Sequence, residues 1–235
     1  MSDLLTAIER KYDFQLPALY HRLYHNGMLD WFPDGGYPHP HWRRDVFPRL
    51  QQRPPVLFYA QDFELMRPEE VLSWEWPEDW SPAHRFVPLG QTGGGDVYAF
   101  CPSLAPAGGE VPVILSLHDD NQTTVLAPSL EAFIFREMLD RATSVDSYDV
   151  EGYADFEALR ADWQRAAAAI SPYLRPAWNA VLTEVYARPL QTETVVLPRR
   201  RYTVDTLLPQ AEFEQLLQRE MSFPQLNATF EHFTA

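Results

Sequence analysis

Three consecutive glycines separate two apolar runs near the middle of the chain, and this feature constrains the fold most strongly. The stretch from Phe86 to Phe100 reads FVPLGQTGGGDVYAF. Apolar, β-favouring residues on both sides of a glycine cluster are typical of a strand, a tight turn and a returning strand. Consecutive glycines have a large backbone entropy cost, so a compact fold keeps them where φ must be positive or where backbones approach closely. We therefore predict a hairpin at the centre of an antiparallel sheet.

Two later apolar runs extend this sheet. Val113–Leu117 and Thr123–Leu126 have strand composition, and the polar residues 118–122 lie between them. Such spacing predicts that the hairpin continues as a meander. Helix signals precede and follow the strands, so the predicted fold class is α+β. We expect an antiparallel β-meander sheet flanked by N-terminal helices and a closing helix, with a mainly helical C-terminal extension.

The flanking helices are predicted from their caps. Ser2 and Asp3 are suitable N-caps for a first helix, and Leu16-Pro17 begins a second helix that ends at Asn26-Gly27. Ser129 caps the closing helix. Prolines and a glycine pair predict a loop from Leu29 to Pro55. After it we expect a strand at Val56–Ala60, an extended piece at Phe63–Met66 and a helical turn that begins at Pro68.

The C-terminal portion is predicted to be mainly helical. Apolar residues at helical spacing predict helices over Tyr153–Ile170, from about Arg175 and from Pro209, with a strand at Thr192–Leu197. These helices cannot bury their apolar stripes alone, so they pack on the first portion or on another copy of the chain. If the apolar stripes that contain Trp163 and Trp178 pack on another copy of the chain, the protein is a homodimer. The expected domains are residues 1–140 and residues 141–235, the second packed on the first.

Several of these motifs occur together in the SUKH superfamily. They are the helix from Leu16-Pro17 to Asn26-Gly27, the run from Phe86 to Gly90, Gly94-Gly95-Asp96 followed by Tyr98, and the step from Pro128 to Phe133. In this order they resemble that superfamily over about residues 1–140. The superfamily contains fungal cell-wall synthesis regulators and many bacterial toxin-immunity proteins. The resemblance therefore implies a protein that acts by binding another protein.

The charge balance restricts the class of partner. The chain has a formal net charge of −14. Binding to nucleic acid depends on neutralising phosphates, so a chain this acidic is not expected to bind nucleic acid directly. The negative charge would attract a basic partner through electrostatic steering. It is explained equally well as a contribution to solubility alone.

Cysteine content and hydropathy indicate the compartment. Cys101 is the single cysteine, so no disulfide can form within the chain. The N-terminal residues MSDLLTAIERKYDF include charges where a signal peptide needs an apolar run. No stretch approaches the roughly 20 apolar residues of a membrane-spanning helix. We therefore expect a cytoplasmic protein that does not bind membranes.

The segment Ser73–Ser81, SWEWPEDWS, is the most unusual local stretch. One interpretation is an exposed recognition loop, in which tryptophans anchor a partner and carboxylates attract a cationic surface. The other is a solvated loop whose tryptophans fold back over the edge of the core. The candidate partner-binding residues are those of this loop together with two from the turn at 118–122: Trp74, Glu75, Trp76, Glu78, Asp79, Trp80, Asp119 and Asp120.

Enzymatic patterns are weak throughout the sequence. The glycine cluster lacks the G-x-G-x-x-G spacing of a phosphate-binding loop, and a tight hairpin explains it. His39-Pro40-His41 has no second histidine pair or zinc motif to complete a metal site. Cys101 precedes a proline at a strand end, where nothing activates a thiol. The basic run Arg199–Arg201, reinforced by Arg188, fits an acidic partner or a solvated strand end. We expect no cofactor.

These observations lead to three hypotheses. The first is a non-enzymatic immunity protein that neutralises a cognate secreted bacterial toxin, possibly a nuclease-type effector, by occluding its active site. The second is a regulatory protein–protein interaction module that acts on a housekeeping partner. The third is a metal-dependent hydrolase that uses His39 and His41. The first two follow from the resemblance, and genetic context distinguishes them.

Overall fold

A computed structural model describes residues 2–32, 40–78, 80–81, 83–197 and 200–233. The chain forms two compact units, each assembled from separate segments. Unit 1 comprises Met1–Asp30, Asp62–Phe133 and Ser222–Ala235, and unit 2 comprises Trp31–Gln61 and Ile134–Met221. These units are defined by contacts, whereas the domains 1–140 and 141–235 were defined along the sequence and stay a prediction.

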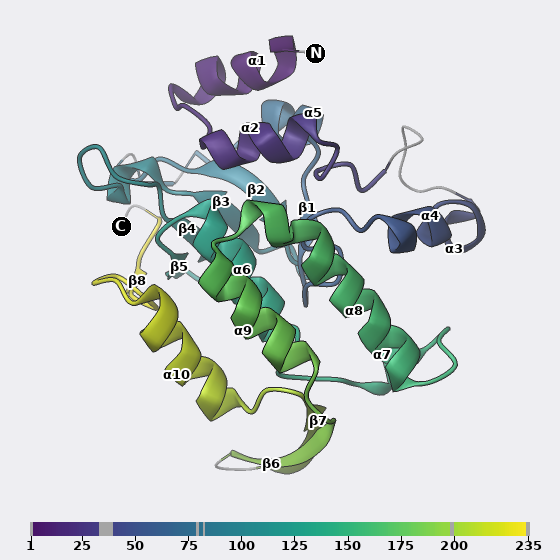
Figure 1. Ribbon diagram of the computed structural model, residues 1–235. Coiled ribbons are helices and arrows are strands. Elements are labelled where there is room, and N and C mark those ends of the chain that lie inside the picture. Colours follow the sequence, from purple (N-terminus) through teal and green to yellow (C-terminus); the bar gives the residue numbers. More distant parts are fainter. Residues whose placement is uncertain (1, 33–39, 79, 82, 198–199, 234–235) are drawn as a thin grey trace. The chain divides into compact units, whose positions relative to one another are not determined.

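Unit 1 is built on an antiparallel sheet. In its described part the sheet has six strands in the order β1-β2-β3-β4-β5-β8, and every neighbouring pair is antiparallel. Figure 1 shows the meander of its middle strands in blue and teal. The strands are β1 (Glu64–Leu65), β2 (Val87–Gln91), β3 (Val97–Phe100), β4 (Val113–Ser116), β5 (Thr123–Ala127) and β8 (Thr229–Phe230). The predicted meander and the α+β class are confirmed, whereas the C-terminal strand β8 was not anticipated.

The glycine-rich turn closes the β2–β3 hairpin as predicted. Gly95 has a φ of 99°, in the left-handed region that glycine tolerates. The backbone N–H of Asp96 donates to the hydroxyl of Thr92 at 3.0 Å, which closes the turn. A different constraint acts at Gly90 in β2, where an added Cβ would lie 2.6 Å from the ring of Phe63. Glycine at that position allows the close approach of β1.

Helices of unit 1 begin and end near the expected caps. They are α1 (Ser2–Tyr12), α2 (Ala18–His25), α5 (Pro68–Ser73) and the 3-10 turn Pro102–Leu104, and the chain leaves unit 1 within α6 (Leu130–Asp140). Gly27 follows α2 with a φ of 69°, the left-handed conformation expected after a helix C-terminus. The hydroxyl of Ser129 accepts a hydrogen bond from the N–H of Ala132 at 3.2 Å, so Ser129 caps α6 as predicted.

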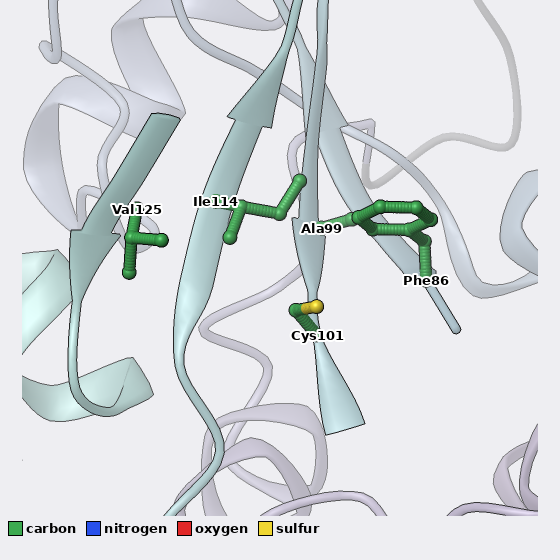
Figure 2. Packing of buried hydrophobic residues seen from close by; sticks show 5 residues of the cluster. All are labelled: Phe86, Ala99, Cys101, Ile114 and Val125. Atoms are coloured by element: carbon green, nitrogen blue, oxygen red, sulfur yellow. The ribbon is translucent and has the colours of Figure 1, made fainter. Parts of the chain in front are cut away.

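Part of the core of unit 1 lies across neighbouring strands. A buried cluster joins Phe86, Ala99, Cys101, Ile114 and Val125, whose side chains are 0–4 % exposed. Figure 2 shows Val125, Ile114 and Ala99 side by side on β5, β4 and β3. Removing apolar surface from water stabilises the fold by about 25 cal/mol per Å². This cluster therefore fixes the middle of the sheet, from which the strand ends and their turns project.

Unit 2 is mainly helical and includes a two-stranded hairpin. Its elements are α3 (Trp42–Asp45), α4 (Phe47–Gln52), α7 (Ser147–Val150), α8 (Phe156–Ile170), the 3-10 turn Ser171–Tyr173, α9 (Pro176–Tyr186), β6 (Gln191–Leu197), β7 (Arg200–Thr206) and α10 (Gln210–Met221). Helices α8 and α9 run side by side (Figure 1). None of the helices in the described residues is long and apolar enough to cross a bilayer.

Two predictions for the segment 29–60 were wrong. The expected loop contains the short helices α3 and α4, and the expected strand Val56–Ala60 is a series of turns. Pro54 and Pro55 lack backbone N–H donors for a sheet ladder, and Leu57 has a φ of 58°, which no strand permits. The N–H of Ala60 instead donates to the carbonyl oxygen of Leu57 at 2.9 Å.

The apolar stripes that suggested a homodimer are buried within a single chain. Trp163 and Trp178 are 1 % and 2 % exposed within a single chain, so their stripes are already covered. Trp178 stacks on Phe135 with ring centroids 4.5 Å apart, and Trp163 packs against Tyr186 at 6.1 Å. A second copy of the chain is therefore not needed to bury these helices.

Candidate functional site

The tryptophan loop lies against the edge of the core of unit 1. Trp76 and Trp80 pack together at a tilt with ring centroids 4.3 Å apart, and the indole N–H of Trp76 donates to the carbonyl oxygen of Phe86 at 3.1 Å. Trp74 continues the row, 5.7 Å from Trp76. All three rings are half-buried, which agrees with the core-edge interpretation. Their exposed remainder still offers apolar surface beside the loop carboxylates.

The carboxylates of the same loop face solvent. The side chain of Glu75 is 85 % exposed and forms an ion pair with Lys11 at 3.0 Å. Lys11 also donates to the carbonyl oxygens of Leu72 and Trp74, which fixes the start of the loop. Glu78 is exposed, and Asp79 lies outside the described residues. The Lys11 contacts therefore hold the backbone beside the exposed Glu75 in place.

A C-terminal segment joins this loop to the turn between β4 and β5. Trp80 forms an antiparallel bridge with Phe233, and the N–H of Ser81 donates to the carbonyl oxygen of His232 at 2.7 Å. On the other side, Asn121 Oδ1 accepts hydrogen bonds from the N–H groups of His232 and Phe233, at 2.8 and 2.7 Å. The loop and the turn that carry the candidate residues therefore contact one common segment. We call the loop 74–81, the turn 118–122 and the segment 230–233 the acidic rim.

A buried polar cluster fixes the C-terminal segment to the sheet. His232 is 0 % exposed, and its Nδ1 lies 2.9 Å from the hydroxyl of Thr123 and 3.2 Å from the hydroxyl of Ser116. The Thr123 hydroxyl donates to the Ser116 hydroxyl at 3.1 Å. Buried hydrogen-bonded groups of this kind specify one arrangement, because an unpaired group in the interior is destabilising. The C-terminal segment around His232 is thus held in place on the sheet of unit 1.

The turn at the other end of the rim is acidic and ordered by Asp96. Asp119 and Asp120 are exposed. Asp96 Oδ1 accepts hydrogen bonds from the backbone N–H of His118 at 3.0 Å and from its ring Nδ1 at 2.8 Å. The hydrogen bond to Asp96 raises the pKa of His118 above its usual value. Below that pKa the imidazolium offsets part of the negative charge of the turn.

One group in the described residues has the composition of a cation site. Ligand atoms of Asp96, His118 and Asp119 lie within 4.8 Å of one another. The hydrogen bonds from His118 to Asp96 already explain this proximity as a structural turn. Of the predicted metal candidates, His39 lies outside the described residues, and His41 is exposed at the start of α3.

The other predicted reactive or basic groups are Cys101, Arg188 and the run Arg199–Arg201. Cys101 is buried in the core cluster, and burial raises the pKa of its thiol, which disfavours the reactive thiolate. Arg188 pairs with Glu184 at 2.8 Å and with Glu212 at 2.6 Å. Of the basic run, Arg199 lies outside the described residues and Arg201 is exposed on β7.

Sequence reasoning missed Asn121 and His232. Asn121 was part of a polar turn like many others, and His232 lies in a C-terminal stretch with no periodic pattern. Their importance comes from hydrogen bonds between residues more than 100 positions apart. Local patterns carry no signal for such pairs.

Comparison with known families agrees with the fold of unit 1. The family model of the SMI1/KNR4 family (SUKH-1) matches residues 2–136. The chain belongs to this family. The match covers more than half of the chain, from α1 through β5 into α6, and it confirms the resemblance to the SUKH superfamily. No curated protein and no solved structure matches the chain.

Family membership sets the general type of activity. The SUKH family includes immunity proteins and SMI1/KNR4-type regulators, and its members generally act through protein–protein interaction rather than catalysis. The matched region contains the tryptophan loop and the acidic turn, but the C-terminal segment that joins them lies beyond it. In this SUKH-1 protein the rim therefore combines family and non-family residues.

Proposed function

We propose that this SUKH-1 protein is a non-enzymatic immunity protein that binds a cognate secreted bacterial toxin at the acidic rim and occludes the toxin's active site. The observation that carries the proposal is the convergence of the tryptophan loop and the acidic turn on one C-terminal segment. Family membership supplies the class of activity, and the rim supplies a surface suited to it.

The electrostatics of the rim fit a basic partner. Glu75, Glu78, Asp119 and Asp120 are exposed, and the whole chain has a net charge of −14. Charge complementarity of this kind accelerates encounter and selects against acidic partners. A toxin that acts on nucleic acid has an electropositive cleft, and rim carboxylates would occupy the positions of phosphates there. The toxin would be inhibited in a one-to-one complex.

The fixed position of the C-terminal segment within the rim favours tight binding. Binding is opposed by the conformational entropy that loops lose when they become ordered. A loop that is already fixed loses less of this entropy. The rim is held by the His232 cluster and by the paired N–H groups on Asn121. The half-buried rings of Trp76 and Trp80 add apolar contact area beside the charges.

A regulatory module is the alternative within the same family. It would use the same rim on a housekeeping protein, and SMI1/KNR4-type regulators are precedents. The neighbouring gene discriminates between the two: a toxin or secretion-effector gene next to this one favours immunity.

The experiment measures binding to the toxin encoded by the neighbouring gene, made catalytically inactive for expression. The test variant is Asp119→Asn with Asp120→Asn, and the control is Glu110→Gln with Glu214→Gln, two exposed carboxylates outside the rim. Both variants change the net charge equally. We expect the rim variant to weaken binding about tenfold or more and to reduce its salt dependence, with a much smaller effect of the control. Absence of binding by the native chain, or equal effects of both variants, would refute the proposal.

A further inference from the structure

Unit 2 contains a cavity of a size that suits a small molecule. Its volume is about 430 Å³, within the range of roughly 300–1,000 Å³ that is typical of ligand pockets. Six aromatic side chains form much of its wall: Trp42, Phe47, Phe58, Tyr59, Tyr153 and Trp163. Such walls favour a flat, largely apolar ligand.

Two of the lining residues carry a buried hydrogen-bond donor that has no acceptor among the described residues. These donors are the indole Nε1 of Trp42 and the Nε of Arg141, and both atoms are buried. The side chain of Arg141 is only 9 % exposed. A buried donor without a partner destabilises a fold by about 1–3 kcal/mol, and native proteins seldom retain one without a reason. A ligand with acceptor atoms in the cavity would satisfy both donors.

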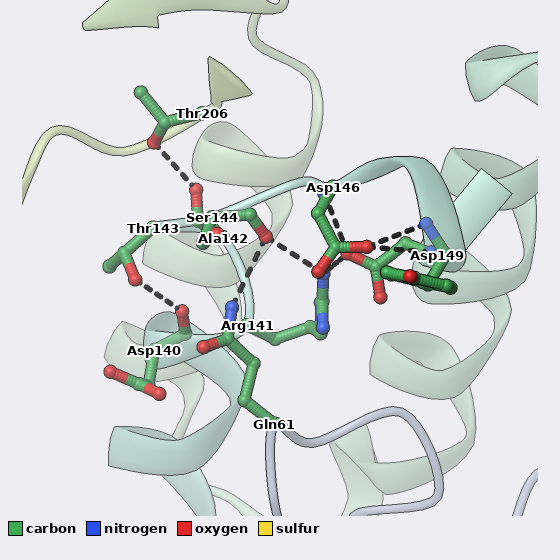
Figure 3. A network of polar contacts seen from close by, with 10 residues as sticks. Gln61, Asp140, Arg141, Ala142, Thr143, Ser144, Asp146, Asp149 and Thr206 are labelled. Atoms are coloured by element: carbon green, nitrogen blue, oxygen red, sulfur yellow. Dashed lines mark hydrogen bonds and ion pairs between the residues drawn. The ribbon is translucent and has the colours of Figure 1, made fainter. Parts of the chain in front are cut away.

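Arg141 is held rigidly in the wall. Its Nη2 donates to Asp149 Oδ2 at 2.5 Å and to the carbonyl oxygen of Ser144 at 2.7 Å (Figure 3). Its guanidinium also lies over the ring of Trp163, 4.6 Å from the ring centroid. Asp149 is itself fixed, because it accepts a hydrogen bond from the N–H of Asp146 at 2.9 Å. The donor geometry is therefore already set before any ligand binds.

The positive and negative side chains that line the cavity balance one another. Arg43 and Arg141 are opposed by Asp149 and Glu151, and the pair Arg141–Asp149 is in direct contact. The hydroxyls of Tyr59 and Tyr153 both donate to Asp162 at 2.9 Å, so these donors are already in use. A balanced wall gives no advantage to a charged ligand, which would lose its hydration without gaining a free counter-charge.

We propose that this cavity binds a small uncharged molecule with a flat aromatic body and carbonyl-type acceptor atoms that receive hydrogen bonds from Trp42 and Arg141. This site lies wholly in unit 2, and it contains residues beyond the SUKH-1 match, which ends at residue 136. It is independent of the toxin-binding proposal, because no rim residue lines the cavity.

Three indole probes of similar size distinguish the chemical classes. Indole-3-acetamide is neutral and has a carbonyl acceptor, indole-3-acetate is an anion, and tryptamine is a cation without an acceptor. Binding of each to the full chain is measured by titration calorimetry and by heteronuclear NMR. We expect the amide to bind with a Kd on the order of 1 mM, at least several-fold tighter than the other two. Tightest binding of tryptamine or of the acetate, or no binding of any probe, would overturn the proposal.

Matched tryptophan variants locate the site. Trp42→Phe keeps an aromatic ring but removes the unpaired indole donor. Trp31→Phe is the control: Trp31 is also half-buried in unit 2, but its indole N–H already donates to Val56 at 3.0 Å and it does not line the cavity. We expect Trp42→Phe to weaken binding of the amide roughly three- to tenfold, and Trp31→Phe to leave it unchanged. Thermal unfolding verifies that both variants are folded. Unchanged binding by Trp42→Phe, or equal losses in both variants, would refute the assignment.

Discussion

The two units differ in the polar groups that they bury. In the described part of unit 1 the buried polar side chains are hydroxyls and one histidine, namely Thr92, Ser116, Thr123, Ser129 and His232. In unit 2 they include the charged residues Glu137, Arg141 and Asp162. No carboxylate in the described part of unit 1 is buried. Unit 2 places charge in its interior, so its stability depends on single ionisable groups and on pH.

The largest expected effect concerns Asp162. This carboxylate is 2 % exposed and accepts hydrogen bonds from Gln51 at 2.6 Å and from Tyr59 and Tyr153 at 2.9 Å. It also pairs with Arg165. Asp162→Ala leaves three part-buried donors without their buried acceptor, so we expect a loss of about 3–5 kcal/mol in the free energy of unfolding, measured in urea. A loss below about 1 kcal/mol would contradict the contrast between the units.

Glu137 provides the next effect and a pH dependence. Burial raises the pKa of this carboxyl to about 8 from an ordinary value of 4.5, and the neighbouring charge of Asp140 adds to the rise. The folded state therefore binds a proton more tightly than the unfolded state. Its stabilisation is complete below pH 4.5 and is lost as the pH rises through about 8.

The corresponding variant is Glu137→Gln, compared with the exposed Glu214→Gln. Glu137→Gln should raise the free energy of unfolding at pH 9 by roughly 2–4 kcal/mol and change it little near pH 4.5, because only the ionised carboxylate is destabilising. Glu214→Gln should leave the free energy of unfolding unchanged at both pH values. Urea unfolding across this pH range provides the measurement, and parallel profiles for native chain and Glu137→Gln would exclude the assignment.

A smaller effect is expected in unit 1. Ser116→Ala removes one hydroxyl from the His232 cluster, while Thr123 remains within 2.9 Å of the ring. We expect a loss of about 1 kcal/mol, the usual net value of a neutral hydrogen bond. Faster hydrogen exchange at residues 230–233 should accompany it, because the cluster fixes that segment. A loss as large as that of Asp162→Ala would remove the distinction between the two interiors.

The smallest effect concerns His118. The hydrogen bond to Asp96 raises the pKa of this exposed imidazole, so its small stabilisation is present below pH 6.5 and is lost as the pH rises through the raised pKa. NMR titration of the His118 ring should give a pKa above 6.5, and Asp96→Asn should lower it. A titration that is the same in both proteins would show that Asp96 does not hold the ring.

The elements that the sequence predicted correctly have strong local signals. The glycines around Gly95 determined the hairpin, and caps such as Ser129 and Pro17 determined helix ends. The failure at residues 56–60 occurred where local backbone constraints override composition. Residues 56–60 are apolar and β-favouring, yet the preceding prolines and the φ of Leu57 make them turns.

The rim shows the same division. Composition alone made Trp80 and Asp120 candidates, whereas Asn121 and His232 became visible only through hydrogen bonds across more than 100 residues. The buried charges of unit 2 were equally hidden. Asp162 lies between apolar residues of α8 and resembles any solvated helix carboxylate, and its partners come from distant segments.

Hydrogen–deuterium exchange of the full chain, with and without a toxin encoded by a neighbouring gene, tests the central claim most directly. The acidic rim as the binding surface predicts slower exchange at residues 74–81, 118–122 and 230–233 in the complex, and unchanged exchange at residues 149–163 of unit 2. Protection confined to unit 2, or no protection anywhere, would contradict it.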